Sequence, residues 1–180
     1  MTFVDERPDL PMSGCSRRSS YACEVPALLV VVTEIDAASD VVFGLELDMD
    51  VHAASLAASG ETATTSTGQR RVALGDEVTF RAHHFGLVWR MTSRITAYEP
   101  PRRFVDEQVR GPFRALRHEH VFDDLGDGRT RMTDRMTVSA PLGLLGALVT
   151  RVLLAPYLRR LLKQRSAHIK RLAEAWDDQA

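Results

Sequence analysis

The feature that most constrains the fold is a change of hydrophobic period near residue 140. Between residues 61 and 140 apolar and polar side chains alternate with a period of two, and after Leu142 apolar side chains recur every three or four residues. The alternation is clearest over 87–98. There one face carries Leu87, Trp89, Met91, Ser93 and Ile95. Consecutive strands followed by one long helix predict an antiparallel meander with one face covered by that helix.

Turn-forming residues separate about seven predicted strands. The expected strands are 28–33, 61–67, 75–85, 87–98, 103–110, 114–123 and 130–140. Two short helices are expected after the first strand, one N-capped by Asp36 and one over 50–58 that ends at Gly60. The long C-terminal helix contains Pro156, which predicts a kink or a division into two pieces.

Length and composition favour one domain. The chain has 180 residues, 44% hydrophobic and 26% charged, with a formal net charge of −1, which argues against nucleic-acid binding. We expect a loose extension over 1–26, a single ligand-binding domain over 27–176 and a tail over 177–180. Two features of the extension stay open, namely the redox state of Cys15 and Cys23 and whether Met1 or Met12 is the true start.

Several protein classes lack their sequence signals. The longest early apolar run, 27–32, is far shorter than the roughly 20 residues of a membrane span, and no secretory signal is visible, so we expect a cytoplasmic protein. The nucleophile elbow, the phosphate-binding glycine loop and the dinucleotide fingerprint are all missing from the sequence. Hydrolase, kinase and dehydrogenase activities therefore have no support, and we expect no cofactor.

A strongly curved sheet closed by one helix leaves a hollow between them, where a ligand would sit. Alternation predicts which side chains face that hollow. The expected ligand-binding residues are Trp89, Met91, Phe104, Gln108, Leu116, Phe122, Met132, Met136, Leu145 and Val149.

The same inward faces carry ionisable side chains, and these are the candidate catalytic residues: Asp106, His118, His120 and Asp134. Buried polar groups are costly unless they bind one another or a ligand. Three interpretations stay open: an internal polar network, a binding site for the polar end of a ligand, or a general acid/base pair. The spacing His118-x-His120 would suit a metal, but any alternating strand also produces it, so no metal is expected. His52, on the second short helix, is interpreted as a helix-end polar residue, with a role at the ligand mouth as the alternative.

The C-terminal helix is strongly basic. Up to and including residue 174, Glu174 is the only acidic residue of this helix, whereas seven residues are basic: Arg151, Arg159, Arg160, Lys163, Arg165, Lys170 and Arg171. Such a helix can lie on an anionic membrane, or it can simply present a solvated outer face. The segment 142–154 is unusually apolar, which suggests a movable lid over the ligand.

Several local phrases resemble the START-like superfamily, which includes polyketide cyclases and lipid-transfer domains of the Bet v 1 type. The resemblance extends from about Leu28 to Leu172 and rests on these segments: 35–37 with 42–43, 47–52, 95–106, 111–113, 118–122, 130–134 and 141–143. It implies an α+β helix-grip fold, a curved antiparallel sheet wrapped on a long C-terminal helix. Members bind unrelated ligands, so the fold does not specify the activity.

Three functions follow as hypotheses. The first is a carrier or sensor of a lipid, an isoprenoid or a polyketide-like molecule. The second is a cyclase or dehydratase in which His118 or His120 acts as base and Asp134 or Asp106 orients it. The third is a membrane-surface adaptor that uses the basic helix. The sequence specifies neither the ligand nor the oligomeric state.

Overall fold

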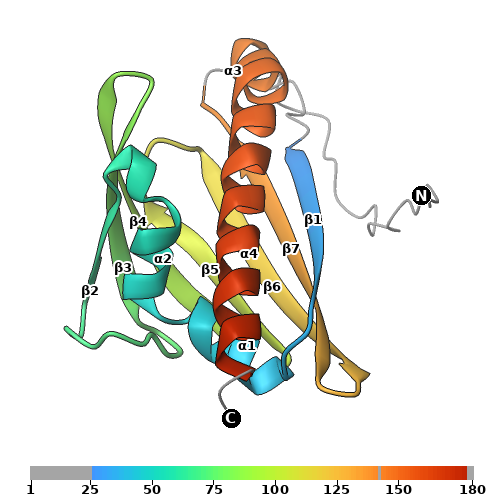
Figure 1. The fold of residues 1–180 in the computed structure, drawn as a ribbon. Helices are drawn as coiled ribbons and strands as arrows, with labels where there is room; N and C mark the ends of the chain where they lie inside the picture. Colours follow the sequence, from blue (N-terminus) through green and yellow to red (C-terminus); the bar gives the residue numbers. More distant parts are fainter. Residues whose placement is uncertain (1–25, 142, 178–180) are drawn as a thin grey trace, which may run out of the picture.

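The structure is a computed structural model that describes residues 26–141 and 143–177. The interpretations of Met12, Cys15 and Cys23, and of the segments 1–25 and 178–180, lie outside the described residues. Within them, a curved sheet wraps around one long helix (Figure 1).

The sheet has seven antiparallel strands in the order β1-β7-β6-β5-β4-β3-β2. Their bounds are β1 Ala27–Ile35, β2 Thr62–Thr65, β3 Glu77–His84, β4 Leu87–Glu99, β5 Arg103–Arg110, β6 Ala115–Gly126 and β7 Arg129–Ser139. Strands β2 to β7 form the expected meander, and β1 pairs with β7 at the edge. The predicted helix-grip architecture is therefore confirmed.

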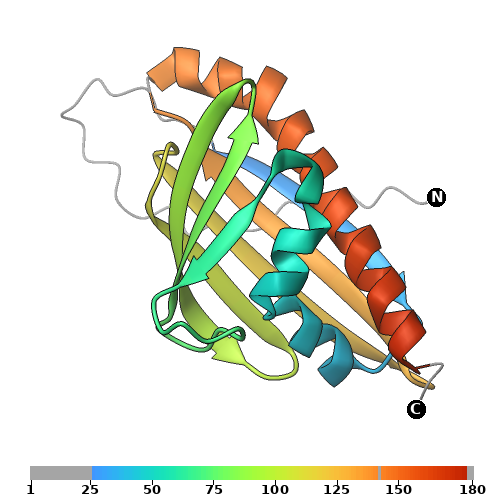
Figure 2. The same ribbon diagram turned by 60° about the vertical axis from the view of Figure 1, so that its left-hand side comes forward.

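The curvature of the sheet has a local cause in β4. Its pairing with β5 shifts register between Thr92 and Ser93 and again between Ile95 and Ala97. Such bulges bend a strand and increase its twist. The sheet consequently curls β2, β3 and β4 toward the helix side, as the rotated view shows (Figure 2).

Two short helices follow β1, as predicted, but their starts differ. Helix α1 spans Ser39–Glu46 and α2 spans Met49–Ser55, followed by a 3₁₀ turn at Ala57–Ser59 that ends at the left-handed Gly60. The prediction that Asp36 caps the first helix is wrong, because α1 begins three residues later and its N-cap is Ala38. Asp48 caps α2 instead, accepting from the backbone N–H groups of residues 50 and 51.

The C-terminal helical region is divided close to Pro156. Helix α3 (Gly143–Val149) leads into a π-helical turn (Thr150–Leu154), and α4 (Ala155–Asp177) follows. Proline cannot donate a backbone hydrogen bond, and its ring crowds the carbonyl four residues earlier, so a wider turn before it relieves the clash. Within residues 26–141 and 143–177, no helix is long and apolar enough to cross a membrane.

Aromatic rings pack together at the end of the sheet below α1. The Phe43 ring lies 5.7 Å from that of Tyr98, 5.8 Å from Phe104 and 5.4 Å from Phe122, each in an edge-to-face arrangement. Ile169 of α4 is fully buried in the same cluster. This cluster therefore joins α1, the sheet and the C-terminal part of α4.

We predict that Phe43→Ala destabilises the protein by about 3–5 kcal/mol, because it empties the centre of this cluster. Urea unfolding followed by circular dichroism measures the change. Phe85→Ala is the matched control, because Phe85 is 51% exposed, and it should cost less than about 1 kcal/mol. Equal losses in the two variants would contradict the assignment of the core.

Candidate functional site

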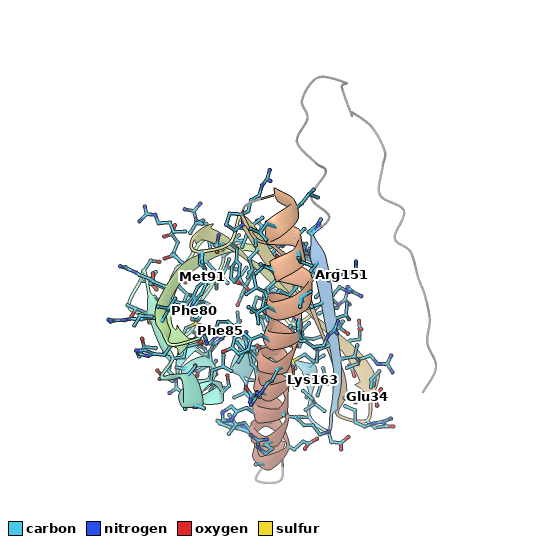
Figure 3. All side chains as sticks on the ribbon, turned by 90° about the horizontal axis from the view of Figure 1, so that it is seen from above. Glu34, Phe80, Phe85, Met91, Arg151 and Lys163 are labelled. Atoms are coloured by element: carbon cyan, nitrogen blue, oxygen red, sulfur yellow. The ribbon has the colours of Figure 1, made fainter. Side chains whose placement is uncertain are left out.

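A cavity of about 170 Å³ lies between the concave face of the sheet and α4. Its walls are mainly apolar side chains of β3, β4, β5, β6 and the helix. Seen along α4, Phe80, Phe85 and Met91 lie on the curved wall beside the helix (Figure 3). The helix side is lined by Leu154, Tyr157, Leu158, Leu161, Leu162 and Arg165.

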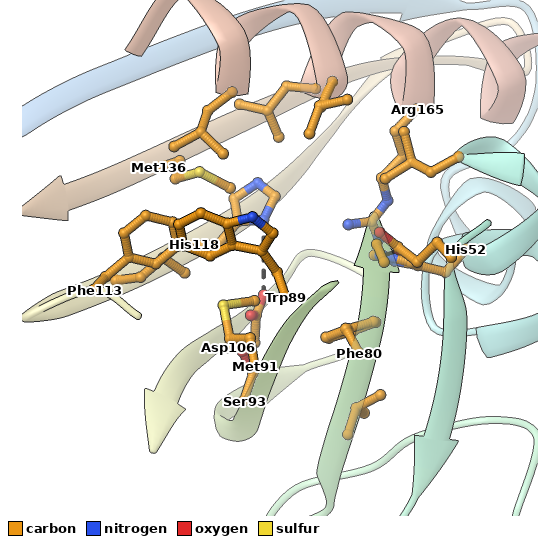
Figure 4. Close-up of a pocket in the computed structure, with 18 of the residues that line it drawn as sticks. His52, Phe80, Trp89, Met91, Ser93, Asp106, Phe113, His118, Met136 and Arg165 are labelled. Carbon is orange, nitrogen blue, oxygen red and sulfur yellow. Dashed lines mark ion pairs between the residues drawn. The ribbon is translucent and has the colours of Figure 1, made fainter. Parts of the chain in front are cut away.

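Half of the predicted ligand-binding residues line this cavity. They are Trp89, Met91, Phe104, Leu116 and Met136, drawn from four neighbouring strands. Two of the predicted catalytic residues, Asp106 and His118, line it as well (Figure 4). The alternation of strand side chains thus located much of the concave wall.

Three other predicted ligand-binding residues point inward but do not line the cavity. Phe122 and Met132 belong to the solid aromatic core, because α1 covers that end of the concave face. Gln108 instead holds the β5–β6 turn: its Nε2 donates to the carbonyl of Phe113 at 2.7 Å, and its Oε1 accepts from the Phe113 N–H at 3.3 Å.

The remaining two, Leu145 and Val149, do not line the cavity either. They are 61% and 39% exposed, while Gly146 and Thr150 face inward. Gly146 is packed so closely that a Cβ atom there would lie 1.9 Å from the carbonyl oxygen of Pro141. A helix position one residue away points about 100° around the axis, which turns Leu145 outward.

The polar centre of the cavity is built from neighbouring strands. His118 of β6 stands opposite Asp106 of β5, and His120 stands opposite Asp134 of β7. His118 Nε2 donates to Asp134 Oδ1 at 3.1 Å, and its Nδ1 lies 3.8 Å from Asp106 Oδ2. Asp134 is held from the helix side as well, because Ser166 Oγ donates to its Oδ2 at 3.1 Å.

His120 completes this cluster from behind the cavity wall. Its Nε2 is 3.4 Å from Asp106 Oδ2, and its Nδ1 is 2.9 Å from Asp134 Oδ1, although the latter contact lacks hydrogen-bond geometry. The ring stacks on Phe104 at 4.1 Å and is fully buried. His120 therefore supports the site without reaching the cavity itself.

The two imidazoles have opposite protonation tendencies. Burial by itself lowers the pKa of His120, but its close contacts with the carboxyl groups of Asp106 and Asp134 outweigh it and raise the pKa to about 9. Burial, together with the charge of His120, lowers the pKa of His118. At neutral pH the cluster thus holds one imidazolium and one neutral imidazole.

Both carboxyl groups of the cluster are ionised. Burial raises the pKa of Asp106, but the hydrogen bond with His120 and the electrostatic influence of the two neighbouring histidines bring it down to about 2. Burial opposes ionisation of Asp134 too, and its hydrogen bond with His118 and its close contact with His120 nevertheless lower its pKa. Two carboxylates around one imidazolium leave a net negative charge, and Asp106, with a side chain 17% exposed, borders the cavity.

Asp106, His118 and His120 also form a set whose donor atoms lie within 4.8 Å of one another, as a divalent cation would require. A metal would have to displace the proton that His120 holds with its raised pKa.

A second polar group lines the cavity, and the sequence analysis did not connect its members. His52 of α2 lies 2.9 Å from Glu61 Oε1, and the Arg165 guanidinium of α4 binds the carboxylate of Glu46 of α1. Arg165 is thus buried, which corrects its assignment to a basic outer helix face. Helical spacing contained the signal, since Leu158, Leu162, Arg165 and Ile169 follow one another at three- and four-residue steps.

One side of the cavity is bounded by β3, β4 and the start of α4. Tyr157 Oη and His84 Nδ1 share a hydrogen bond of 2.7 Å, and the Trp89 indole N–H donates to the His84 carbonyl at 2.8 Å. The Phe85 ring lies 4.6 Å from that of Tyr157. These contacts join the sheet edge to the helix beside the cavity.

Comparison with known folds agrees with this architecture. An aromatase/cyclase named Zhui from Streptomyces sp. R1128 superposes with a TM-score of 0.70 at 15% identity, over 83% of this chain and 94% of that one. A START superfamily protein from Mycobacterium smegmatis gives a TM-score of 0.56 at 12% identity, over 84% and 97%. A major latex-like protein from Panax ginseng gives 0.55 at 15% identity, over 79% and 97%. At these identities the likeness establishes the fold alone.

No curated protein matches the chain. The family model described as polyketide cyclase / dehydrase and lipid transport, however, matches residues 27–174, nearly the whole described part. The antiparallel sheet and the long helix agree with the fold of the solved structures that superpose on this chain. The chain therefore belongs to the polyketide cyclase/dehydrase and lipid transport family.

Proposed function

We propose that the protein binds a small hydrophobic molecule in the cavity beneath α4 and acts as its carrier or sensor, in the cytoplasm that the sequence predicts. The observation that carries this proposal is an apolar cavity with a pre-organised polar cluster on one wall. Family membership supports hydrophobic-ligand binding in general. Apolar walls supply affinity, and a few fixed polar groups orient the ligand.

The internal balance of the cluster favours binding over chemistry. Each imidazole nitrogen of His118 and His120 already has a carboxylate oxygen within 3.8 Å. Such a network holds its charges in place and offers fixed acceptors to a ligand. A proton-transfer catalyst needs a nitrogen that gains and loses its proton near the working pH, and His120, with a pKa raised to about 9, keeps its proton at neutral pH.

A cyclase or dehydratase is the second candidate, and one observation favours it. His118 donates through Nε2 to Asp134, which leaves Nδ1 as the basic nitrogen of a residue that lines the cavity. This is the arrangement of a base oriented by a carboxylate. In such an enzyme Nδ1 would take a proton from the carbon between two carbonyls of a polyketone, and loss of water would follow ring closure.

We predict that Met91→Trp abolishes binding of an apolar fluorescent probe such as N-phenylnaphthylamine, because the larger ring fills the cavity that Met91 lines. Probe fluorescence should fall by at least about tenfold at a fixed concentration. Leu145→Trp adds the same ring on the exposed face of α3 and should leave binding unchanged. Full probe binding by Met91→Trp would contradict a ligand in this cavity.

The carrier and the enzyme differ in their response to His118→Gln. For a carrier, we expect the affinity for the probe to change less than about fivefold, with no turnover in either protein. An enzyme would release water from a linear polyketone thioester, detectable by mass spectrometry, and would lose at least about a hundredfold in rate in the variant. Water loss by the wild type would replace the carrier proposal with the cyclase.

We also predict that the cluster makes the free energy of unfolding decrease as the pH rises into the alkaline range. The folded pKa of His120 is raised to about 9, so its stabilising contribution is complete below its ordinary value near 6.5 and declines as the pH rises through 9. His120→Gln should cost roughly 3 kcal/mol at pH 6.5 and flatten this decline. Urea unfolding between pH 6 and 10 measures both effects, and an unchanged alkaline slope in the variant would refute the assignment. His83→Gln, at an exposed position, is the control.

A further inference from the structure

Buried polar atoms without a hydrogen bond gather around the cavity. Within the described part of the chain, those that belong to lining residues are Glu46 Oε1, His52 Nδ1, Glu61 Oε1, Ser93 Oγ and Arg165 Nε. Native proteins satisfy nearly all buried polar atoms, so several orphans in one place call for an explanation. A bound molecule that carries polar groups would satisfy them.

Four of these atoms form a compact group on the opposite side of the cavity from Trp89 and Phe113. In the close-up, His52 and Arg165 lie beside each other on that side (Figure 4). The side chains are almost completely withdrawn from solvent: 0% exposed for Glu46, 7% for Glu61, 9% for Arg165 and 12% for His52. We call this group the second polar end.

Its internal contacts leave acceptors and one donor free. The His52–Glu61 pair, 2.9 Å apart, lacks hydrogen-bond geometry, so Glu61 Oε1 keeps its accepting capacity. Arg165 uses an Nη2 group on Glu46, and its Nε–H is free to donate. A hydroxyl group can both donate and accept, and so it complements this mixture.

Charge further restricts the chemical class of the ligand. The Glu46 carboxylate pairs with the Arg165 guanidinium, and burial lowers the pKa of His52 beside Glu61. The cluster of Asp106, Asp134 and protonated His120 is negative by one charge. A ligand carboxylate has no hydrogen to donate to the free oxygens of Glu46 and Glu61, and Asp106 would repel it in a medium of low dielectric constant.

We propose that the cavity selects an uncharged hydrophobic molecule with two hydroxyl groups, one bound at the second polar end and the other at Asp106 and His118. Fatty acids and other anionic lipids are excluded from it. This inference rests on the proposed function and specifies the ligand's chemical class. The fifth unpartnered atom, Ser93 Oγ, belongs to neither polar end and lies on the cavity wall among apolar residues of β4.

A matched series of naphthalenes tests the proposal on the wild-type protein by calorimetry. We expect naphthol to bind at least about tenfold more tightly than naphthalene, and a naphthalenediol with hydroxyls on opposite rings about fivefold more tightly still. Naphthoate should bind at least about tenfold more weakly than naphthol. Equal affinities across the series, or tightest binding by naphthoate or by a naphthylmethylammonium ion, would overturn the inference.

Two variants test whether the second polar end causes the preference for hydroxyl groups. Glu61→Gln replaces the carboxyl group by an amide that can donate to a ligand carboxylate, so it should raise the affinity for naphthoate relative to naphthalene by about fivefold. His52→Phe keeps a ring against Phe80, 4.6 Å away, but removes the nitrogens, so the advantage of the diol over naphthol should disappear. Glu77→Gln is the matched control, because Glu77 pairs with Arg94 away from the cavity, and it should change neither ratio.

Each comparison is a ratio within one folded variant, so a loss of stability does not imitate the effect. If His52→Phe fails to fold, the Glu61→Gln ratio still decides the question. The two proposals fail differently. If no member of the series binds, naphthalene included, the hydrophobic-ligand proposal fails. If naphthalene, naphthol and naphthoate bind alike, only the selection for hydroxyl groups is wrong.

Discussion

The attachment of α4 to the sheet is the constraint on which the site depends. Apolar contacts hold the helix at Ile169 and Ala173, and polar contacts hold it where Ser166 meets Asp134 and Arg165 meets Glu46. Buried polar contacts are directional, so they fix the rotation of the helix more sharply than apolar packing does. Beyond them the bulged sheet curves around the helix, and the cavity is the space left between the two.

The desolvation penalty of the buried charges is offset by polar side chains that each contact several ionisable groups. Asp134 serves His118, His120 and Ser166, and Glu46 serves Arg165 while lying 3.8 Å from His120. The ionised side chains are therefore linked from α4 through the strands to α1. Removing one member leaves a buried charge without compensation, which is why such clusters tolerate few substitutions. The remaining negative charge is the property that a ligand meets.

Much of the concave wall could be predicted from alternation alone. Strand periodicity placed Asp106, His118 and Met136 on the inward face, because successive strand residues point to opposite sides. It could not say which inward residues border space and which are covered. Phe122 lies under α1, and His120 lies behind Phe104. The prediction that Leu145 lines the cavity is wrong for another reason, because the π-helical turn before Pro156 sets the rotation of α3 relative to α4.

The sequence by itself determined the order of the elements and the inward faces of the strands, because both follow from local periodicity and turn residues, and the resemblance of its local segments indicated the family. Tertiary structure alone decided that Arg165 leaves the basic helix face for Glu46, and that Glu46, His52 and Glu61 meet at one cavity. These residues are far apart along the chain, and their meeting depends on how the curved sheet closes on α4. Burial and charge compensation, which set the protonation of His120, exist only after that closure.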